Sequence, residues 1–243
     1  MSRAAKAKPV SAQKTEGRND IMEAAAEAIA EHGFHGMSMR DLAKATGKGL
    51  ASLYNYFDSK EDLLFALQAG AFEALVESAN EAMAGSTDTA ARLYALVLNH
   101  VRYVAEHPNV MRVLVHEASA LPPAQRKRVR QLKEAYYALC EPLVRALLLE
   151  GCKRPGAAGT PRVDQAEVER ATYSVFGTLN WVYTWYQPAR HGPPHEVART
   201  IHRMVLCGLV AACPMRVDLT ALERRLKSSP TSSPIRSTVM EGE

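Results

Sequence analysis

The sequence predicts an all-α protein with a small N-terminal domain and a larger C-terminal domain. Apolar residues recur at helical spacing along nearly the whole chain, whereas alternating strand patterns are almost absent. Apolar residues make up 47% of the 243 residues, which is enough for a packed core. About nine helices are expected, near residues 18–32, 39–46, 50–57, 59–84, 88–106, 108–119, 123–151, 164–187 and 194–213.

Composition excludes several classes of protein. Thirty Lys and Arg against 26 Asp and Glu give a net charge of +4, so the position of the charge matters more than its sum. Cys140, Cys152, Cys207 and Cys213 lack CxxC spacing, which favours reduced thiols over a disulfide or zinc framework. With no apolar run long enough for a membrane span and no apolar N-terminal leader, the sequence predicts a cytoplasmic protein without a membrane partner.

The two ends of the chain differ from its middle. Residues 1–17 are small, polar and basic, which predicts a flexible arm. Residues 227–243 are rich in Ser and Pro and predict a disordered tail. Between these ends we expect one domain at 18–64 and another at 65–226, with a Gly- and Pro-containing loop at 152–163.

The first expected helix carries one apolar stripe and has a clear end. Ile21, Ala25 and Ile29 follow one another at intervals of four residues, and Gly33 then stops the helix. Ser38 with an acidic residue three positions later forms a capping box for the second helix.

A short glycine-bracketed turn joins the second and third expected helices. Gly47 and Gly49 bound this turn, and the third helix is then expected to place Leu50, Leu53, Tyr54 and Phe57 on one face. This is a helix-turn-helix pattern, whose second helix can enter the major groove of DNA. The spacing alone leaves a plain helical hairpin open as an alternative.

Further residues at fixed spacing make the pattern specific. They are Gly33-Phe34, Ser38-Met39-Arg40-Asp41-Leu42-Ala43, Gly47, Leu53-Tyr54-x-Tyr56-Phe57 and Ser59-Lys60-Glu61-x-Leu63-Leu64. With them, the stretch from Arg18 to Leu64 closely resembles the DNA-binding domain of the TetR (tetracycline repressor-like) family.

The resemblance implies that the second helix lies over the DNA backbone and that the third helix faces the major groove. The implied DNA-binding residues are Ser38, Arg40, Lys48, Gly49, Leu50, Ser52, Tyr54, Asn55, Tyr56 and Lys60. The phenols of Tyr54 and Tyr56 and the Lys60 ammonium are expected near phosphates. For Tyr54, a mainly buried ring is an equal alternative.

Two positions depart from the family pattern. Lys48 follows the turn glycine, where an apolar residue is usual, and Leu50 opens the third helix, where a polar residue is frequent. Lys48 is expected to reach a phosphate or a guanine, and Leu50 either contacts a thymine methyl group or replaces the missing apolar packing. Because of these departures, the sequence does not determine which bases of the operator are recognised.

The fourth helix is long and begins with a second capping box, from Ser59 to Asp62. Its 26 expected residues would span roughly 39 Å. The resemblance gives it the role of connecting the ligand pocket to the DNA-binding domain.

The segment 172–188 holds both tryptophans of the chain and four other aromatic residues. Such a helix is core, subunit interface or pocket wall, with Asn180 or Tyr183 as the polar group that orients a ligand. The last helix has an apolar stripe that includes Val197 and Ile201, which suits the two-fold four-helix interface of the family. We therefore expect a homodimer through the last two helices.

The effector pocket is expected between helix four and the helices near 88–119, 123–151 and 164–187. Its candidate residues, chosen for apolar surface with a few polar groups, are Val104, Met111, Val115, Tyr137, Phe176, Asn180 and Tyr183. The basic run 126–133 is either a solvated face or a contact for an acidic ligand such as a phosphorylated carrier. The C-terminal body is weakly similar to family members that regulate fatty-acid, acyl-CoA or sterol breakdown.

The sequence thus predicts a ligand-responsive transcriptional repressor that binds a palindromic operator as a homodimer. A small apolar effector, for which an acyl-CoA is the first candidate, would release the protein from its operator. His191, His195 and His202 lack metal-site spacing, and no nucleophile elbow or phosphate-binding loop occurs, so we expect neither a metal, a cofactor nor an enzyme. A ligand-independent architectural DNA-binding protein and an enzyme that uses the C-terminal cavity are the alternatives.

Overall fold

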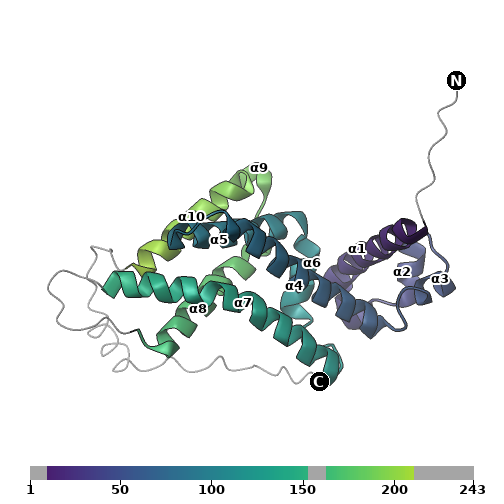
Figure 1. Cartoon of the computed structure of the whole chain (residues 1–243). Coiled ribbons are helices and arrows are strands. Elements are labelled where there is room, and N and C mark those ends of the chain that lie inside the picture. Colours follow the sequence, from purple (N-terminus) through teal and green to yellow (C-terminus); the bar gives the residue numbers. More distant parts are fainter. Residues whose placement is uncertain (1–9, 153–162, 211–243) are drawn as a thin grey trace, which may run out of the picture. The chain divides into compact units, whose positions relative to one another are not determined.

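The computed structural model describes residues 10–152 and 163–210, and in this part of the chain every regular element is a helix (Figure 1). The all-α prediction is therefore confirmed. The elements are α1 (Val10–Gly36), α2 (Met39–Ala45), α3 (Leu50–Tyr54), α4 (Lys60–Ala84), α5 (Thr89–Glu106), α6 (Pro108–His116), α7 (Pro123–Cys152), α8 (Gln165–Asn180), the 3-10 helix η1 (Val182–Thr184), α9 (Pro188–His191) and α10 (Pro194–Leu209). The expected tail, Cys213 and most of the expected loop at 152–163 lie outside the described residues.

Helix α1 begins eight residues earlier than the sequence indicated. Residues 10–17 are helical, so the prediction of a flexible arm was wrong for these residues. Gly33 has φ 73° and ψ 162°, which interrupts the helix at the predicted position. The chain then turns back, and Phe34 is buried in the core of the N-terminal domain.

The turn between α2 and α3 is fixed by local hydrogen bonds. Ser38 caps α2, because its hydroxyl oxygen accepts a hydrogen bond from the Asp41 backbone N–H. At the other end of α2, Gly47 has a φ of 63°, and the Lys48 N–H donates to the carbonyl of Ala43. This left-handed glycine closes the helix in a Schellman motif and aims the chain into α3.

Helix α3 is shorter than the expected 50–57. It ends at Tyr54 with Asn55 as its C-cap, although the Phe57 N–H still donates to the Leu53 carbonyl at 3.1 Å. Leu53 and Phe57 are buried and anchor this segment to the domain core.

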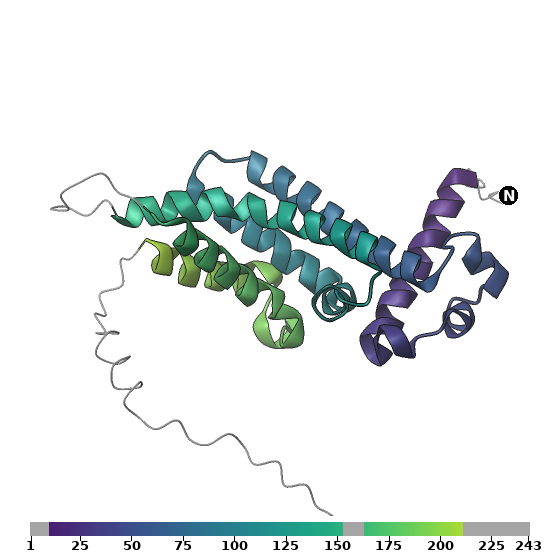
Figure 2. The same ribbon diagram turned by 90° about the horizontal axis from the view of Figure 1, so that it is seen from below.

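Helix α4 connects the two halves of the described chain. Ser59 caps it by accepting from the Asp62 N–H, as the second capping box predicted. Its 25 residues span about 37 Å. The helix contacts α1 near its start and packs against α5, α6 and α7 further along, and Figures 1 and 2 show it running from α1–α3 into the other helices.

The expected helix at 164–187 is broken in the structure. Helix α8 ends at Asn180, and the chain continues through η1 and the short α9. Gln187 is extended, with φ −135° and ψ 115°, because a residue before proline avoids the helical region. The prediction of a single helix through this aromatic segment was therefore wrong. Pro188 accounts for the extended backbone at the end of the segment.

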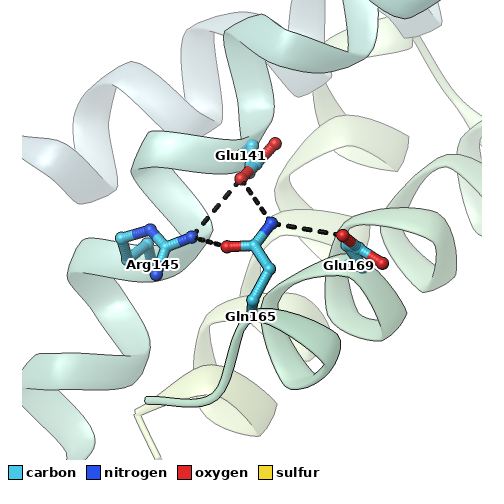
Figure 3. A network of polar contacts seen from close by, with 4 residues as sticks. All are labelled: Glu141, Arg145, Gln165 and Glu169. Carbon is cyan, nitrogen blue, oxygen red and sulfur yellow. Dashed lines mark hydrogen bonds and ion pairs between the residues drawn. The ribbon is translucent and has the colours of Figure 1, made fainter. Parts of the chain in front are cut away.

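A polar network attaches the start of α8 to α7 (Figure 3). The Gln165 amide donates to Glu141 Oε1 at 3.0 Å and to Glu169 Oε1 at 3.2 Å. The Arg145 guanidinium donates to Glu141 at 3.4 Å and to the Gln165 amide oxygen. These contacts set the position of α8, one wall of the cavity described below.

Among the described helices, none combines the length and the apolar character that crossing a membrane requires. The same residues contain no group of three or more His, Cys, Asp or Glu side chains that could hold a metal ion. Cys140 is a buried free thiol and Cys207 an exposed one.

Candidate functional site

The candidate DNA-binding residues lie in one continuous segment, from the start of α2 to the start of α4. Ser38, Arg40, Gly49, Tyr54 and Asn55 are exposed, and Lys48, Leu50, Ser52, Tyr56 and Lys60 are half-buried. The segment therefore offers both free polar groups and side chains that hold the fold.

Tyr54 lies on the outer face of α3. Its side chain is 46% exposed, whereas Leu53 beside it is fully buried. The alternative of a mainly buried Tyr54 ring is therefore wrong. The phenol is accessible for a hydrogen bond to a phosphate, the role that the helix-turn-helix docking mode assigns to such a group.

The two departures from the family pattern have structural explanations. The Lys48 ammonium lies 3.7 Å from Asp20 Oδ2 on α1, so this lysine joins the turn to the first helix. Leu50 packs against the domain core, which favours the packing alternative over contact with a thymine methyl group.

Three other candidates also take part in building the domain. The Lys60 Nζ lies 4.4 Å above the Phe34 ring and 3.5 Å from the His35 carbonyl. The Ser38 hydroxyl donates to the Asp41 carboxylate and so lowers the pKa of this group. The Tyr56 hydroxyl lies so close to Gly17 that a Cβ there would be 2.8 Å from it.

One exposed cation beside α3 was missed by the sequence reasoning. The Arg18 guanidinium lies 5.0 Å above the ring of Phe57, the residue that anchors the end of the α3 segment. No motif marks Arg18, because this contact joins the start of α1 to a residue 39 positions later.

A cavity of about 460 Å³ lies among α4, α5, α6, α7 and α8, between the helices where the pocket was expected. Its lining residues are Phe72, Leu75, His100, Met111, Leu114, Val115, Ala118, Ser119, Arg126, Val129, Arg130, Lys133, Tyr136, Tyr137 and Asn180. Phe72 and Leu75 are part of α4, so the connecting helix forms one wall directly.

Four of the seven candidate ligand residues line this cavity: Met111, Val115, Tyr137 and Asn180. Phe176 stands behind the wall and stacks flat on Tyr137, with ring centroids 3.8 Å apart and an interplanar angle of 3°. Val104 is buried but is not a lining residue. Tyr183 hydrogen-bonds to His116 at 2.7 Å and also lies outside the lining.

The inner wall is apolar except for a few buried or half-buried polar groups. Asn180 Nδ2 donates to the Tyr137 hydroxyl at 3.1 Å, so both side chains are held in place. His100 Nδ1 lies 3.1 Å from the Tyr136 hydroxyl. Burial lowers the pKa of His100 to about 4 and raises the pKa of Tyr136, so both groups are neutral near pH 7.

Three cations of the basic run border the same cavity. Arg126, Arg130 and Lys133 follow one another at i, i+4 and i+7 on α7 and therefore share one face of this helix. The Lys133 Nζ lies 5.2 Å above the Tyr137 ring. Arg128 points elsewhere, with its guanidinium 4.0 Å from Glu73. Arg130 and Lys133 are exposed and Arg126 is half-buried, so these cations lie on a solvated face that also borders the cavity.

One short chain of hydrogen bonds connects this cavity with the N-terminal domain. The Gln68 amide on α4 donates to the Glu117 carbonyl at 3.2 Å. The Glu117 carboxylate in turn accepts a hydrogen bond from the Phe34 backbone N–H at 3.1 Å. Glu117 directly precedes Ala118 and Ser119, which line the cavity. These contacts link the residue beside the cavity wall to the segment just before α2.

Curated proteins of similar sequence are transcriptional regulators. The HTH-type transcriptional repressor KstR2 of Rhodococcus jostii is 26% identical over 199 residues, which are 82% of this chain and 93% of that protein. The Fatty acid metabolism regulator protein of Bacillus subtilis is 25% identical over 174 residues, which are 71% of this chain and 85% of the relative.

Solved structures share the fold over most of the chain. A TetR-family transcriptional regulator from Bordetella parapertussis has a TM-score of 0.70 and 26% identity, covering 82% of this chain and 98% of its own. The structure of AibR in complex with isovaleryl coenzyme A and operator DNA has a TM-score of 0.65 and 23% identity, covering 77% and 97%.

Two family models match along the chain. The model of bacterial regulatory proteins of the tetR family matches residues 21–67 and includes the whole helix-turn-helix. The model of the tetracyclin repressor-like C-terminal domain matches residues 86–209, which is more than half of the chain and holds most of the cavity wall. The protein belongs to the TetR family of bacterial transcriptional regulators.

Proposed function

We propose that this protein is a homodimeric repressor that binds a palindromic operator in the cytoplasm and leaves it when an acyl-CoA or a similar amphiphilic acid fills the cavity. The observation that carries this proposal is the composition of the cavity wall. Apolar side chains from α4, α6 and α7 form most of its interior, and Arg126, Arg130 and Lys133 border it. This combination suits a ligand with an apolar chain and a phosphorylated end.

The DNA-binding part of the proposal rests on the exposed face of the helix-turn-helix. Tyr54 and Asn55 are exposed at the end of α3, and Arg40 is exposed on α2. Asn55 is the candidate for reading a base, because an amide can make a bidentate contact with adenine. Arg40 and Tyr54 are the candidates for fixing the position on the phosphates.

The dimer is supported by apolar side chains left exposed on the last two long helices. Tyr173 and Trp181 on or next to α8 are 62% and 55% exposed, and Met204 on α10 is 65% exposed. Gly177 lies between the two aromatic residues, and a Cβ there would meet no atom within 4 Å. The chain itself therefore does not require this glycine, whereas the close approach of a partner helix would.

Similar proteins support the choice of effector. The curated relative from Bacillus subtilis is named for fatty acid metabolism, and AibR, which shares the fold, is bound to isovaleryl coenzyme A. An extended acyl-CoA offers phosphates to the cationic border and a chain to the apolar interior, which matches the wall of this cavity.

Release from DNA would use the contacts of Glu117. A ligand that displaces Ala118 and Ser119 would move Glu117, which holds the Phe34 N–H and the Gln68 amide. Phe34 lies four residues before the capping residue of α2, so its displacement reaches the helix-turn-helix. The effector has to bind the displaced conformation more tightly than the DNA-bound one.

The test is a binding-site selection followed by titration with acyl-CoA thioesters of different chain length. We expect one palindromic site whose half-sites are about 34–36 Å apart, and loss of binding on addition of a thioester. Binding that is spread over unrelated sequences would contradict the operator, and this is the behaviour of the architectural alternative. A specific site that no thioester releases would contradict the effector alone.

A further inference from the structure

His100 lines the cavity, and one of its ring nitrogens has no hydrogen-bond partner among the described residues. The side chain is 1% exposed, and Nε2 makes no hydrogen bond among the described residues. Nδ1 is engaged with the Tyr136 hydroxyl at 3.1 Å. A buried polar atom without a partner destabilises the fold, so a residue of this kind is expected to serve a purpose.

The hydrogen bond to Tyr136 determines which nitrogen of His100 carries the proton. Tyr136 is itself buried, and among the described residues His100 Nδ1 is the sole recorded partner of its hydroxyl. If Nδ1 carried the proton, the hydroxyl hydrogen would be left without an acceptor in addition to the unpaired Nε2. The favoured arrangement has the Tyr136 hydroxyl donating to Nδ1, so that Nε2 carries the proton and is a free donor.

The ring is also held in a fixed orientation. It stacks on Tyr136, with centroids 5.9 Å apart and an angle of 19°, and meets the Phe176 ring at 63°. Burial keeps the imidazole neutral, because its pKa is lowered to about 4. One lining residue of the cavity thus carries a preoriented, uncharged hydrogen-bond donor in a largely apolar surrounding.

We infer that His100 donates a hydrogen bond from Nε2 to the neutral carbonyl oxygen of an acyl thioester, and that the cavity thereby selects thioesters over ligands without this oxygen. The inference rests on the proposed function for the kind of effector. Arg126 precedes Tyr136 by ten residues on α7, about 15 Å along the helix. An extended ligand with its phosphates near Arg126 therefore places more apolar parts beside His100.

A neutral donor also suits a thioester better than a free fatty acid. A carboxylate in this apolar interior would be a buried charge facing an uncharged partner, and its desolvation costs more than that of a carbonyl. The side chain of Arg126 is half-buried and that of Arg130 is exposed, whereas His100 is buried. The charged end of the effector is thus expected at the border and its carbonyl inside.

The test compares two ligands that differ only in the carbonyl group. Calorimetry on the full chain would use the tightest-binding acyl-CoA from a chain-length panel and the S-alkyl-CoA of equal length, in which a methylene replaces the carbonyl. We expect the unaltered protein to bind the thioester about fivefold to tenfold more tightly. His100→Phe should reduce this preference to less than twofold, whereas His195→Phe, at an exposed position on α10, should keep it.

A preference that His100→Phe leaves unchanged would overturn the inference. If His100→Phe fails to fold, His100→Gln supplies the second variant, since its amide can donate and should retain part of the preference. Nitrogen NMR of the ligand-free protein tests the tautomer independently of any effector. A proton on Nε2 supports the inference and a proton on Nδ1 contradicts it, even if no thioester binds and the proposed effector class fails.

Discussion

The helix-turn-helix segment, which is the proposed DNA-binding surface, and the cavity of this protein are built in opposite ways. The first is made by residues 38–60, in which each element follows the last through a cap or a tight turn. The second is made by five helices, and its walls come from residues as far apart as Phe72 and Asn180. Local hydrogen bonds fix the first surface, whereas long-range packing fixes the second.

This difference predicts how each region responds to substitution. On α3 the neighbours Leu53 and Tyr54 have separate roles, because the first side chain is buried and the second is exposed. In the cavity wall, lining residues such as Tyr136 and Tyr137 also take part in the packing of the C-terminal domain. Functional and structural effects should therefore separate cleanly in the first region and overlap in the second.

The largest effect is expected from a pair of neighbours on α3. Leu53 is fully buried, so Leu53→Ala should lower the free energy of unfolding by about 2–5 kcal/mol and abolish operator binding. Tyr54→Phe should change this free energy by less than about 0.5 kcal/mol and still weaken DNA binding, because only the hydroxyl group of an exposed side chain is lost. Denaturant unfolding measures the free energy of unfolding of each variant, and operator titration measures its DNA binding. Equal losses of stability in Leu53→Ala and Tyr54→Phe would contradict the separation of roles.

The cations at the cavity border should control effector binding without affecting DNA. Arg130→Gln is expected to weaken acyl-CoA binding by about tenfold or more, since a charge-assisted contact is worth about 1.5–3 kcal/mol. Lys127→Gln is the matched control, because Lys127 belongs to the same run but is exposed and does not line the cavity. Identical losses in the two variants, measured by calorimetry, would show that the run acts as a diffuse charge.

Glu117 should transmit the effector signal rather than bind either ligand. Glu117→Gln retains a side-chain oxygen for the Phe34 N–H but loses the charge, and Glu117→Ala removes the contact altogether. We expect the ratio of operator affinities without and with effector to fall slightly in the first variant and severalfold in the second. If Glu117→Ala leaves this ratio unchanged while both ligands still bind, the coupling runs through other contacts.

The smallest effect is expected at the start of α4. Lys60→Ala should weaken binding to all DNA sequences alike and reduce the slope of log affinity against log salt by roughly one phosphate contact per half-site. The contacts of Lys60 with the Phe34 ring and the His35 carbonyl bring its ammonium back onto the domain, which limits this change. An unaltered salt slope would remove Lys60 from the DNA-binding surface.

Local patterns allowed most of the fold to be predicted. The capping residues Ser38 and Ser59 and the glycines Gly33 and Gly47 mark their helix ends within a few residues, so the sequence contains this information directly. The break after Asn180 was missed, because an aromatic helix and an aromatic turn have the same composition.

The cavity could be placed between helices but not described in detail. A polar His100 within the apolar stripe of α5 was a usable signal, since Leu96, Val97 and Val104 on the same stripe are buried. The contacts of Glu117 had no such signal. They join residues 49 and 83 positions apart, and only the packing of α4 and α6 against the N-terminal domain brings these groups together.

The most direct test of the whole account is calorimetric titration of one acyl-CoA into the protein with and without its selected operator. If the effector releases DNA, thermodynamic linkage requires that the operator weaken acyl-CoA binding by the same factor by which acyl-CoA weakens operator binding, typically about 5–150-fold. We predict equal factors in this range. An acyl-CoA that binds equally tightly in both titrations would contradict the account, however high its affinity.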